Sequence, residues 1–358
     1  MQATTVPFVD TELGAASDFN QPPRVLAVIP GDGEGNSFIF ARRQVASLVR
    51  AGVTIQTLYL EPCRSVQQFF TQWRRLNRAI QAFSPHLIHA HYGTVTSFLC
   101  ACGTGRPLII TFRGSDLNRD ARIGFVRGRL GLLLSQFSAL KASVIICTSS
   151  QLVDQLWWRR KKATVLPSGA DLTLFRPDEM QKFRERIGWK PDELVVVFNA
   201  GKNPLLKGLP LAREAVAIVQ SKFAPVRLFE FDGSTPPENM PTYLNAADCL
   251  LLASEAEGSP NIVKEALACN LPIVSVDVGD VAERLRAVSP SFIVERDPEQ
   301  IARALIEALS AKKRSNGRER VAELSEARIA ERLCSIYESI VSRDKQGVGA
   351  VISVDSSR

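Results

Sequence analysis

The chain has 358 residues, of which 45% are hydrophobic and 23% charged, and its formal net charge is +7. This length suits two domains of roughly 150 to 180 residues, each large enough to bury a core. No apolar run approaches the roughly 18 residues of a membrane-spanning helix, and residues 1–23 lack a signal-peptide pattern, so we expect a cytoplasmic protein. Seven cysteines without paired spacing predict reduced thiols rather than disulfides or a zinc site.

The first half of the chain alternates strands with helices. Strands are predicted at residues 24–30, 53–60, 86–91, 108–112, 143–148 and 164–167, with the first two helices at 37–51 and 66–83. Strands separated by helices in this way predict an α/β fold with a parallel, doubly wound sheet.

The second half repeats the pattern after a charged segment. Residues 172–190, which include Pro177, are predicted to be the linker region. Five further strands, which begin at Leu194, Val226, Cys249, Ile273 and Phe292, predict a second sheet. We therefore place the domains at residues 24–177 and 178–328, with polar tails at 1–23 and 344–358 expected to be flexible.

A glycine-rich loop follows the first strand. Gly31, Gly33 and Gly35 begin a dinucleotide-binding fingerprint, but Asn36 stands where its third glycine is required. A tight strand-to-helix turn needs such glycines for its own geometry, so this loop alone does not predict a dinucleotide site.

All three histidines lie on or beside the third predicted strand. His89 and His91 share one face of that strand while His86 points to the other, and no carboxylate or cysteine nearby completes a metal site. We expect no metal here. His91 and Tyr92 stand at the carboxyl end of the strand, where they are expected to face a cleft.

Two lysines follow the first strand of the second half. Lys202 and Lys207 stand at the carboxyl edge of the predicted sheet, where open α/β sheets bind their ligands. Either lysine alone is also consistent with a solvated surface charge. Together they are suited to a diphosphate whose negative charge grows as it departs.

The most informative segment joins a buried strand to a helix between Glu257 and Glu265. Its turn has the consecutive residues Gly258, Ser259, Pro260, Asn261 and Ile262. The N–H groups at the start of a helix attract phosphate, and the two carboxylates can accept hydrogen bonds from sugar or ribose hydroxyls. The alternative is a capped helix with two solvated glutamates.

These segments resemble glycosyltransferase family 4. Residues 201–208 resemble its G-R-x4-K-G segment, with Lys202 in place of the usual arginine, and Glu257 and Glu265 resemble its paired glutamates. Three more segments agree in order, at residues 89–116, 166–177 and 271–280. The resemblance covers roughly residues 24–342.

The resemblance implies a GT-B fold, in which two Rossmann-like domains face each other across a cleft. Residues 24–177 would form the acceptor side and residues 178–328 the nucleotide-sugar side, while a last helix at 329–343 would cross back to the first domain. It also implies a metal-independent hexosyltransferase without cofactors that retains anomeric configuration. We favour a UDP-sugar donor and a role in bacterial cell-surface polysaccharide synthesis.

Specific roles follow for the matching positions. Lys202, Lys207 and the N–H groups after Gly258 would stabilise the departing diphosphate, while Glu257 would hold the donor sugar and Glu265 the ribose. Gly33 and Gly35 would lie in the cleft near the sugar.

On the acceptor side the chain departs from the family. Arg113 replaces the histidine that usually contacts the sugar, and it would bind an acidic sugar or an acceptor phosphate. Asp116, His91 and Tyr92 are further candidates for the acceptor side.

Charge is unevenly divided along the chain. Residues 1–177 carry 20 Lys and Arg against 10 Asp and Glu, whereas residues 178–358 carry 24 against 27. Arg119, Arg122, Arg127 and Arg129 belong to the basic half, as does the run 157–162, which joins two tryptophans to four cations. This pattern favours an anionic membrane surface and a lipid-linked acceptor over a merely solvated basic face. No nucleic-acid recognition motif accompanies it.

Two other classes of function remain open from the sequence. A sugar-nucleotide epimerase would share the fold and the carboxylates but would need no acceptor. A non-catalytic nucleotide-binding or membrane-scaffold protein would keep the phosphate-binding turn without turnover.

Overall fold

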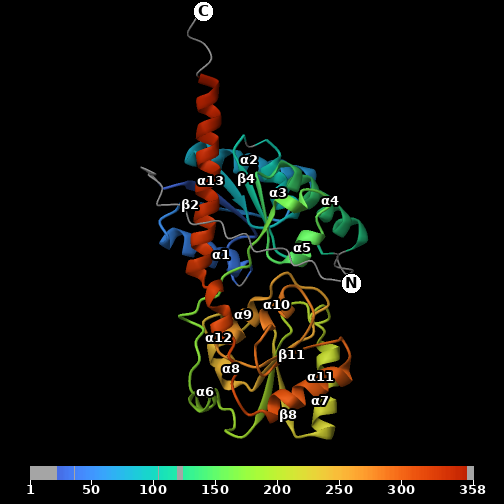
Figure 1. Ribbon diagram of the computed structural model, residues 1–358. Helices are drawn as coiled ribbons and strands as arrows, with labels where there is room; N and C mark the ends of the chain where they lie inside the picture. The colour runs from blue at the N-terminus through green and yellow to red at the C-terminus, as the bar shows by residue number, and fades with distance from the viewer. Residues whose placement is uncertain (1–21, 36, 104, 119–123, 353–358) are drawn as a thin grey trace, which may run out of the picture.

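The computed structural model describes residues 22–352 except 36, 104 and 119–123. The chain forms two α/β domains, with the N-terminal one above the C-terminal one in Figure 1. The glycine-loop residue Asn36 and the basic residues Arg119 and Arg122 lie outside this description, as do residues 1–21 and 353–358 of the predicted tails 1–23 and 344–358. All seven cysteines are free, as the sequence predicts.

The N-terminal sheet has six strands in the order β2-β1-β3-β4-β5-β6, and every neighbouring pair is parallel. The strands are β1 (Arg24–Pro30), β2 (Thr54–Leu60), β3 (Leu87–Ala90), β4 (Leu108–Phe112), β5 (Val144–Cys147) and β6 (Ala163–Val165). The connecting helices are α1 (Ile39–Arg50), α2 (Val66–Phe83), α3 (Thr94–Ala101), α4 (Phe125–Lys141) and α5 (Ser150–Asp154), and the short 3₁₀ helix η1 (Arg160–Lys162) precedes β6.

The C-terminal sheet has five parallel strands in the order β11-β10-β9-β7-β8. They are β7 (Leu194–Asn199), β8 (Val226–Phe231), β9 (Cys249–Leu252), β10 (Ile273–Val276) and β11 (Ser291–Val294). Its helices are α6 (Met180–Ile187), α7 (Leu209–Lys222), α8 (Met240–Ala246), α9 (Asn261–Ala268), α10 (Val281–Leu285), α11 (Pro298–Ser310) and α12 (Gly317–Val321), and the 3₁₀ helix η2 (Ala322–Leu324) follows α12.

Both sheets reverse their strand order beside their first strand. The reversal lies between β1 and β3 in one domain and between β7 and β9 in the other. Ligands of open α/β sheets bind outside the carboxyl ends of the strands at such a point. The loops after β1, β3, β7 and β9 are the four that carry most of the predicted site residues.

The predicted linker is largely folded. Residues 180–187 form α6, whose Arg184 is buried and pairs with Asp248 at 2.8 Å, while Trp189 is buried as well. Further charged residues that suggested a linker lie on the exposed side of α6, and the other side of this helix packs on the C-terminal domain. This part of the linker prediction was wrong, because one buried arginine fixes the segment.

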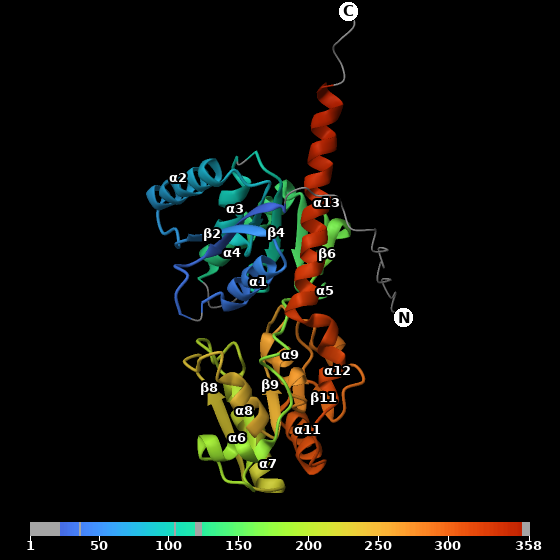
Figure 2. The ribbon, with the colours of Figure 1, turned by 90° about the vertical axis from the view of Figure 1, so that its left-hand side faces the viewer.

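The last helix, α13 (Glu326–Ile352), leaves the C-terminal domain and runs along the N-terminal one (Figures 1 and 2). Its Tyr337 is buried, and the hydroxyl lies 2.7 Å from Nδ1 of His89 on β3. The helix begins three residues before the predicted start at residue 329. It also continues through residues 344–352, which corrects the prediction of a flexible tail there. In the part of the chain that the structure describes, no helix is long and apolar enough to cross a membrane.

Candidate functional site

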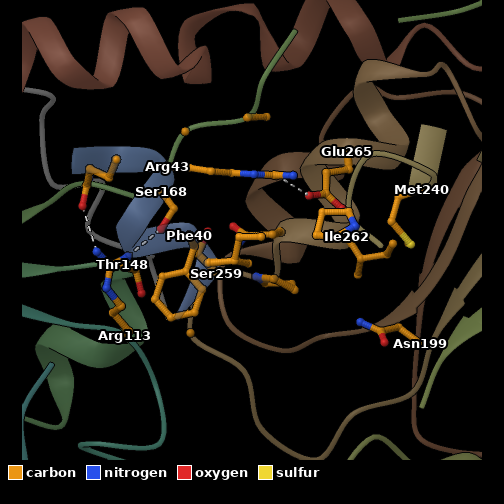
Figure 3. A pocket seen from close by; sticks show the side chains of 18 of the residues that line it. Phe40, Arg43, Arg113, Thr148, Ser168, Asn199, Met240, Ser259, Ile262 and Glu265 are labelled. Carbon is orange, nitrogen blue, oxygen red and sulfur yellow. Dashed lines mark hydrogen bonds and ion pairs between the residues drawn. The ribbon is translucent and has the colours of Figure 1, made fainter. Parts of the chain in front are cut away.

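A cleft of about 400 Å³ lies between the domains at the carboxyl ends of both sheets (Figure 3). Residues of α1 and the ends of β4 and β5 form one wall, and the loops after β7, β8 and β9 form the other. The start of α13 closes one side. The lining residues used below are Phe40, Arg43, Gln44, Arg113, Thr148, Ser168, Lys207, Glu257, Gly258, Ser259, Pro260, Asn261, Ile262, Glu265 and Glu326.

Lys207 and Glu257 are joined at this cleft. The ammonium of Lys207 lies 2.5 Å from Oε1 of Glu257, which also accepts a hydrogen bond from Ser254 Oγ at 2.8 Å. Both charged side chains are largely shielded, with 24% and 13% of their area exposed. Because water screens this shielded pair only weakly, the attraction between the ammonium and the carboxylate holds both groups in place on the cleft wall.

The turn before α9 lies against the N-terminal domain. A Cβ atom on Gly258 would stand 2.0 Å from the carbonyl oxygen of Arg113 and 2.9 Å from Thr148 Oγ1. Only glycine allows this approach, which brings the two domains together at the turn. The first N–H groups of α9 have no acceptor within the helix and form the positive end of its dipole.

Two polar atoms on the cleft wall have no hydrogen-bond partner among the described residues. They are Thr148 Oγ1 in the N-terminal domain and Asn261 Oδ1 at the start of α9, and both are buried. Buried polar atoms are satisfied in nearly all native structures. Their positions on facing walls leave both atoms available to water or to a polar ligand in the cleft.

Glu265 forms an ion pair across the domain boundary. Its Oε1 lies 3.5 Å from the guanidinium of Arg43 on α1. Figure 3 marks this ion pair with a dashed line. Burial raises the pKa of Glu265, and the nearby Arg43 partly opposes that shift. Glu326 of α13 lines the same end of the cleft, and burial raises the pKa of its carboxyl group too. Sequence analysis missed Arg43 and Glu326 because both come from distant parts of the chain.

Lys264 is a third residue that sequence analysis missed. Its side chain is fully buried, and its ammonium donates to the carbonyl oxygen of Ser168 at 2.8 Å and to Ser259 Oγ at 3.1 Å. Burial lowers the pKa of Lys264 to about 8. This lysine joins the turn before α9 to the segment that follows β6. In the sequence, its position next to Glu265 was the signal that could have identified it as a site residue.

Arg113 lies on the N-terminal wall and is held from several sides. Its guanidinium donates to Ser168 Oγ at 2.7 Å and to Gln44 Oε1 at 2.8 Å, and it lies 4.7 Å from the ring centroid of Phe40. Burial lowers the pKa of Arg113 to about 10, which leaves it charged at neutral pH. Its fixed fork is suited to an anionic group in the cleft.

Asp116 is brought near the cleft but does not line it. Its buried carboxylate accepts the backbone N–H groups of Gly93, Arg113 and Gly114 at 2.8 to 3.1 Å. Burial raises the pKa of Asp116, and these hydrogen bonds oppose that shift. The structure thus uses this predicted acceptor-side residue to anchor the loop that carries Arg113.

His91 and Tyr92 differ in position. The His91 ring is fully buried, stacks on His89 at 4.0 Å between centroids, and lies 3.1 Å from the Arg113 guanidinium. Burial and these neighbours lower the pKa of His91 well below its ordinary value, so the ring is neutral. Tyr92 lines a second cavity of about 300 Å³ beside the cleft, together with Ser115, Lys207 and Glu257.

Three predicted donor-side residues lie outside the cleft lining. Lys202 is exposed and stands beside Gly233. The carbonyl oxygens of Gly33 and Gly35 accept hydrogen bonds from the guanidinium of Arg42, so the glycine loop is fixed to α1. Of these, Gly35 lines a shallow open cavity next to Arg43.

The histidines have other partners than a metal. His86 Nδ1 accepts the N–H group of Arg24 at 3.0 Å, and His89 Nε2 lies 2.7 Å from Thr111 Oγ1. Over the described ranges, no group of three or more His, Cys, Asp or Glu side chains is placed to hold a metal ion.

Comparison with known proteins adds two family matches. Residues 32–174 match the model described as Glycosyltransferase Family 4, and residues 189–311 match the model described as Glycosyl transferases group 1. The two matches fall on the two domains in turn.

One curated relative is TuaC of Bacillus subtilis, named as a teichuronic acid biosynthesis glycosyltransferase. The chain is 28% identical to it over 251 residues, which is 62% of this chain and 60% of the relative. The match therefore spans less than two thirds of that protein.

Solved structures with the same fold include sucrose-phosphate synthase of Thermosynechococcus elongatus, with a TM-score of 0.73 and 17% identity over 89% of this chain and all of that one. HepE of Anabaena, determined in complex with UDP, matches with a TM-score of 0.61 and 15% identity over 91% of this chain and all of that one. At these identities the likeness establishes the fold, which is the predicted GT-B arrangement.

Proposed function

We propose that this chain, which belongs to glycosyltransferase family 4, transfers a sugar from a nucleoside diphosphate donor to a glycan or lipid-linked acceptor with retention of configuration. The observation that carries the proposal is one cleft at the carboxyl ends of both sheets. It unites Lys207, Glu257 and Glu265 with the start of α9, which are the groups a nucleotide sugar requires.

The leaving diphosphate would lie between Lys207 and the start of α9. A lysine and helix N–H groups are fixed donors aimed at charge that develops as the glycosidic bond breaks. No metal is needed in this arrangement, because the lysine and the helix dipole supply the positive charge. Lys202 would join them only when the loop after β7 moves, since it is exposed here.

The two glutamates would divide the donor between them. Glu257, paired with Lys207, is placed for the sugar hydroxyls, and Glu265, paired with Arg43, is placed for the ribose. Each carboxylate can accept further hydrogen bonds while it keeps its cation. Retention is typical of this family, and we extend it to this chain.

The acceptor would enter through the second cavity, where Tyr92 and Arg113 face Lys207 and Glu257. Arg113 would receive an acidic sugar or a phosphate of the acceptor. We favour UDP as the nucleotide and bacterial cell-surface polysaccharide as the product, and the names of TuaC and of the UDP-bound HepE support both choices. A lipid-linked acceptor places the enzyme peripherally on the cytoplasmic face of the membrane.

The proposal is tested by a thermal-shift screen against UDP, GDP, ADP and their sugars, followed by product analysis. A ligand at 100 times its dissociation constant adds about 2.7 kcal/mol of stability. Transfer to an acceptor that persists in excess EDTA supports the proposal. Release of an altered nucleotide sugar without acceptor would indicate an epimerase, and binding without turnover a non-catalytic protein.

A further inference from the structure

Helix α4 exposes its apolar face. Its large apolar side chains Val126, Leu130, Leu133, Phe137 and Leu140 recur every three or four residues and so form one stripe. All five are exposed, Val126 by 79% and Phe137 by 51%. Phe125 extends the stripe at the start of the helix.

The inward face of α4 is mostly small and polar, although Leu132 also packs against the core from it. Ser135 Oγ donates to the carbonyl oxygen of Asp116 at 2.8 Å, and Gln136 Nε2 donates to that of Gln155 at 2.9 Å. Ser138 and Ala139 are fully buried on the same face. These hydrogen bonds fix the rotation of the helix about its axis. A helix on a water-exposed surface has the reverse pattern, so the stripe is suited to an apolar partner.

Cations surround the stripe. Helix α4 contains no Asp or Glu but carries Arg127, Arg129 and Lys141, and the guanidinium of Arg129 lies 4.2 Å from the ring centroid of Phe125. Trp157 continues the apolar surface and packs edge-on against Trp158 at 5.7 Å, which in turn lies beside Phe137 at 6.1 Å.

The 157–162 run contributes to this surface in part. Lys161 and Lys162 of η1 are exposed and add two cations beside Trp157. Arg159 points inward, because its guanidinium donates to the carbonyl oxygens of Ala139 and Leu140 at the end of α4, at 2.9 and 3.2 Å. It is therefore a cap of α4 rather than a free surface charge.

We propose that the α4 surface, defined as the apolar stripe of α4 with Trp157 and the flanking cations Arg127, Arg129, Lys141, Lys161 and Lys162, docks on an anionic lipid bilayer. Aromatic and aliphatic side chains between cations match the interface of such a bilayer, where the stripe enters the acyl boundary and the cations meet the headgroups. A second copy of the chain fits less well, because a two-fold contact would bring like cations together.

The position of α4 connects this surface with the cleft. Figure 1 shows α4 on the side of the N-terminal domain away from α13. Ser135 of α4 donates a hydrogen bond to the carbonyl oxygen of Asp116. The Asp116 carboxylate in turn holds the loop whose Gly114 and Ser115 line the second cavity. Docking would therefore set the acceptor side at the membrane. This role rests on the proposed lipid-linked acceptor, whereas docking itself is measured without donor or acceptor.

The test is cosedimentation of the full chain with vesicles of phosphatidylglycerol and phosphatidylcholine at about 0.1 M salt. The wild type should sediment with these vesicles and hardly with pure phosphatidylcholine. The triple variant Val126→Gln, Leu130→Gln, Phe137→Gln should lose at least about tenfold in bound fraction, because three apolar side chains no longer enter the bilayer. Lys161→Gln with Lys162→Gln should weaken binding most at low salt.

A matched control comes from α2, where Val66 and Phe70 are exposed to a similar degree, by 74% and 53%. Val66→Gln with Phe70→Gln should bind vesicles as the wild type does. Equal losses in the α2 and α4 variants would overturn the proposal, as would a wild type that never sediments. A wild type that dimerises through α4, shown by sedimentation velocity, and ignores vesicles would assign the stripe to a second copy. Vesicle binding without any transferase activity would retain the docking surface and reject the proposed function instead.

Discussion

Lys207 is the residue whose replacement tests the leaving-group chemistry most directly. Lys207→Ala should lower turnover by about 100-fold or more, because it removes a cation aimed at the developing charge of the diphosphate. Lys202→Ala provides the comparison and should cost less, since Lys202 is exposed outside the cleft lining. Steady-state kinetics measure the turnover of both variants and show which lysine matters more. Near-normal turnover of the Lys207 variant would remove this lysine from the mechanism.

Replacement of each of the two glutamates should impair the handling of a different ligand. Glu265→Ala is expected to weaken binding of the bare nucleoside diphosphate, because its carboxylate lies at the end of the cleft assigned to the ribose. Glu257→Ala should leave that affinity almost unchanged and impair reaction of the sugar donor. Calorimetry with UDP and with the UDP-sugar measures both effects. Equal losses of UDP affinity would contradict this division, although both residues would still belong to the cleft.

The buried ammonium of Lys264 makes stability depend on pH. Its pKa is about 8 in the folded protein and 10.5 ordinarily, so between these values the folded state has lost a proton that the unfolded state keeps. Stability from this group therefore rises with pH over that window, by as much as about 3 kcal/mol, and is constant below it.

Lys264→Met should abolish that rise. The free energy of unfolding of the wild type relative to the variant is expected to increase from pH 7 to about pH 10, as measured by urea denaturation at each pH. The cysteines, whose pKa values burial raises, titrate alike in both proteins and cancel in the difference. A difference independent of pH would show that Lys264 keeps its ordinary pKa.

Among the elements, α13 joins the two domains, and its buried Tyr337 contacts His89 on the N-terminal sheet. Tyr337→Phe removes the hydroxyl that lies 2.7 Å from His89 Nδ1, and the ring nitrogen then stays buried without a partner. The expected cost is about 1 to 3 kcal/mol of unfolding free energy. Urea denaturation followed by tryptophan fluorescence measures this cost, since three of the four tryptophans, Trp73, Trp157 and Trp158, lie in the N-terminal domain.

Ser339→Ala on the same helix is the control for this change, because Ser339 is exposed and its Oγ donates to the carbonyl oxygen of Ile336 within α13. It should alter stability by a few tenths of a kcal/mol at most. If Tyr337→Phe matches it, the hydrogen bond between Tyr337 and His89 contributes nothing to stability.

The elements also show what the sequence can predict here. Buried β-branched runs predicted β1 and β4 to the residue, because parallel strands covered on both faces have continuous apolar sequences. The positions of Lys207 and Glu257 followed, since strand ends share one edge of a sheet. The partners of these residues did not follow. Arg43 reaches Glu265 from 222 residues away, and Lys264 is buried by a segment almost 100 residues distant, so neither contact leaves a local pattern.

The same limit explains the residues whose roles changed. Asp116 stands at the expected position of the motif, yet its carboxylate accepts hydrogen bonds from three backbone N–H groups. These bonds depend on the conformation of the loop, which the spacing of residues in the sequence does not reveal. The α4 stripe was missed for the opposite reason. The apolar residues at 126, 130, 133, 137 and 140 can be read from the sequence, although Leu132 and Leu134 interrupt the pattern. Periodicity alone also does not tell which face of a helix is buried.

At the scale of the whole molecule, we expect activity to depend on the approach of the two domains at Gly258. A methyl group there would stand 2.0 Å from the Arg113 carbonyl oxygen, so Gly258→Ala should hold the domains apart while each keeps its fold. A displacement of about 1 Å between reacting groups can lower turnover by about 100-fold. Affinity for UDP should change far less, because Lys207 and Glu265 belong to one domain.

Gly124→Ala is the matched control, since a Cβ on Gly124 meets no atom of the described residues within 4 Å and its φ of −40° suits alanine. Turnover and UDP affinity of both variants, together with the radius of gyration from small-angle X-ray scattering with bound UDP, separate the effects. The Gly258 variant should lose turnover and stay more extended when UDP is present, whereas the Gly124 variant should resemble the wild type. Full activity of Gly258→Ala would mean that transfer occurs with the domains farther apart than in this structure, and Arg113 would then have no place beside the donor.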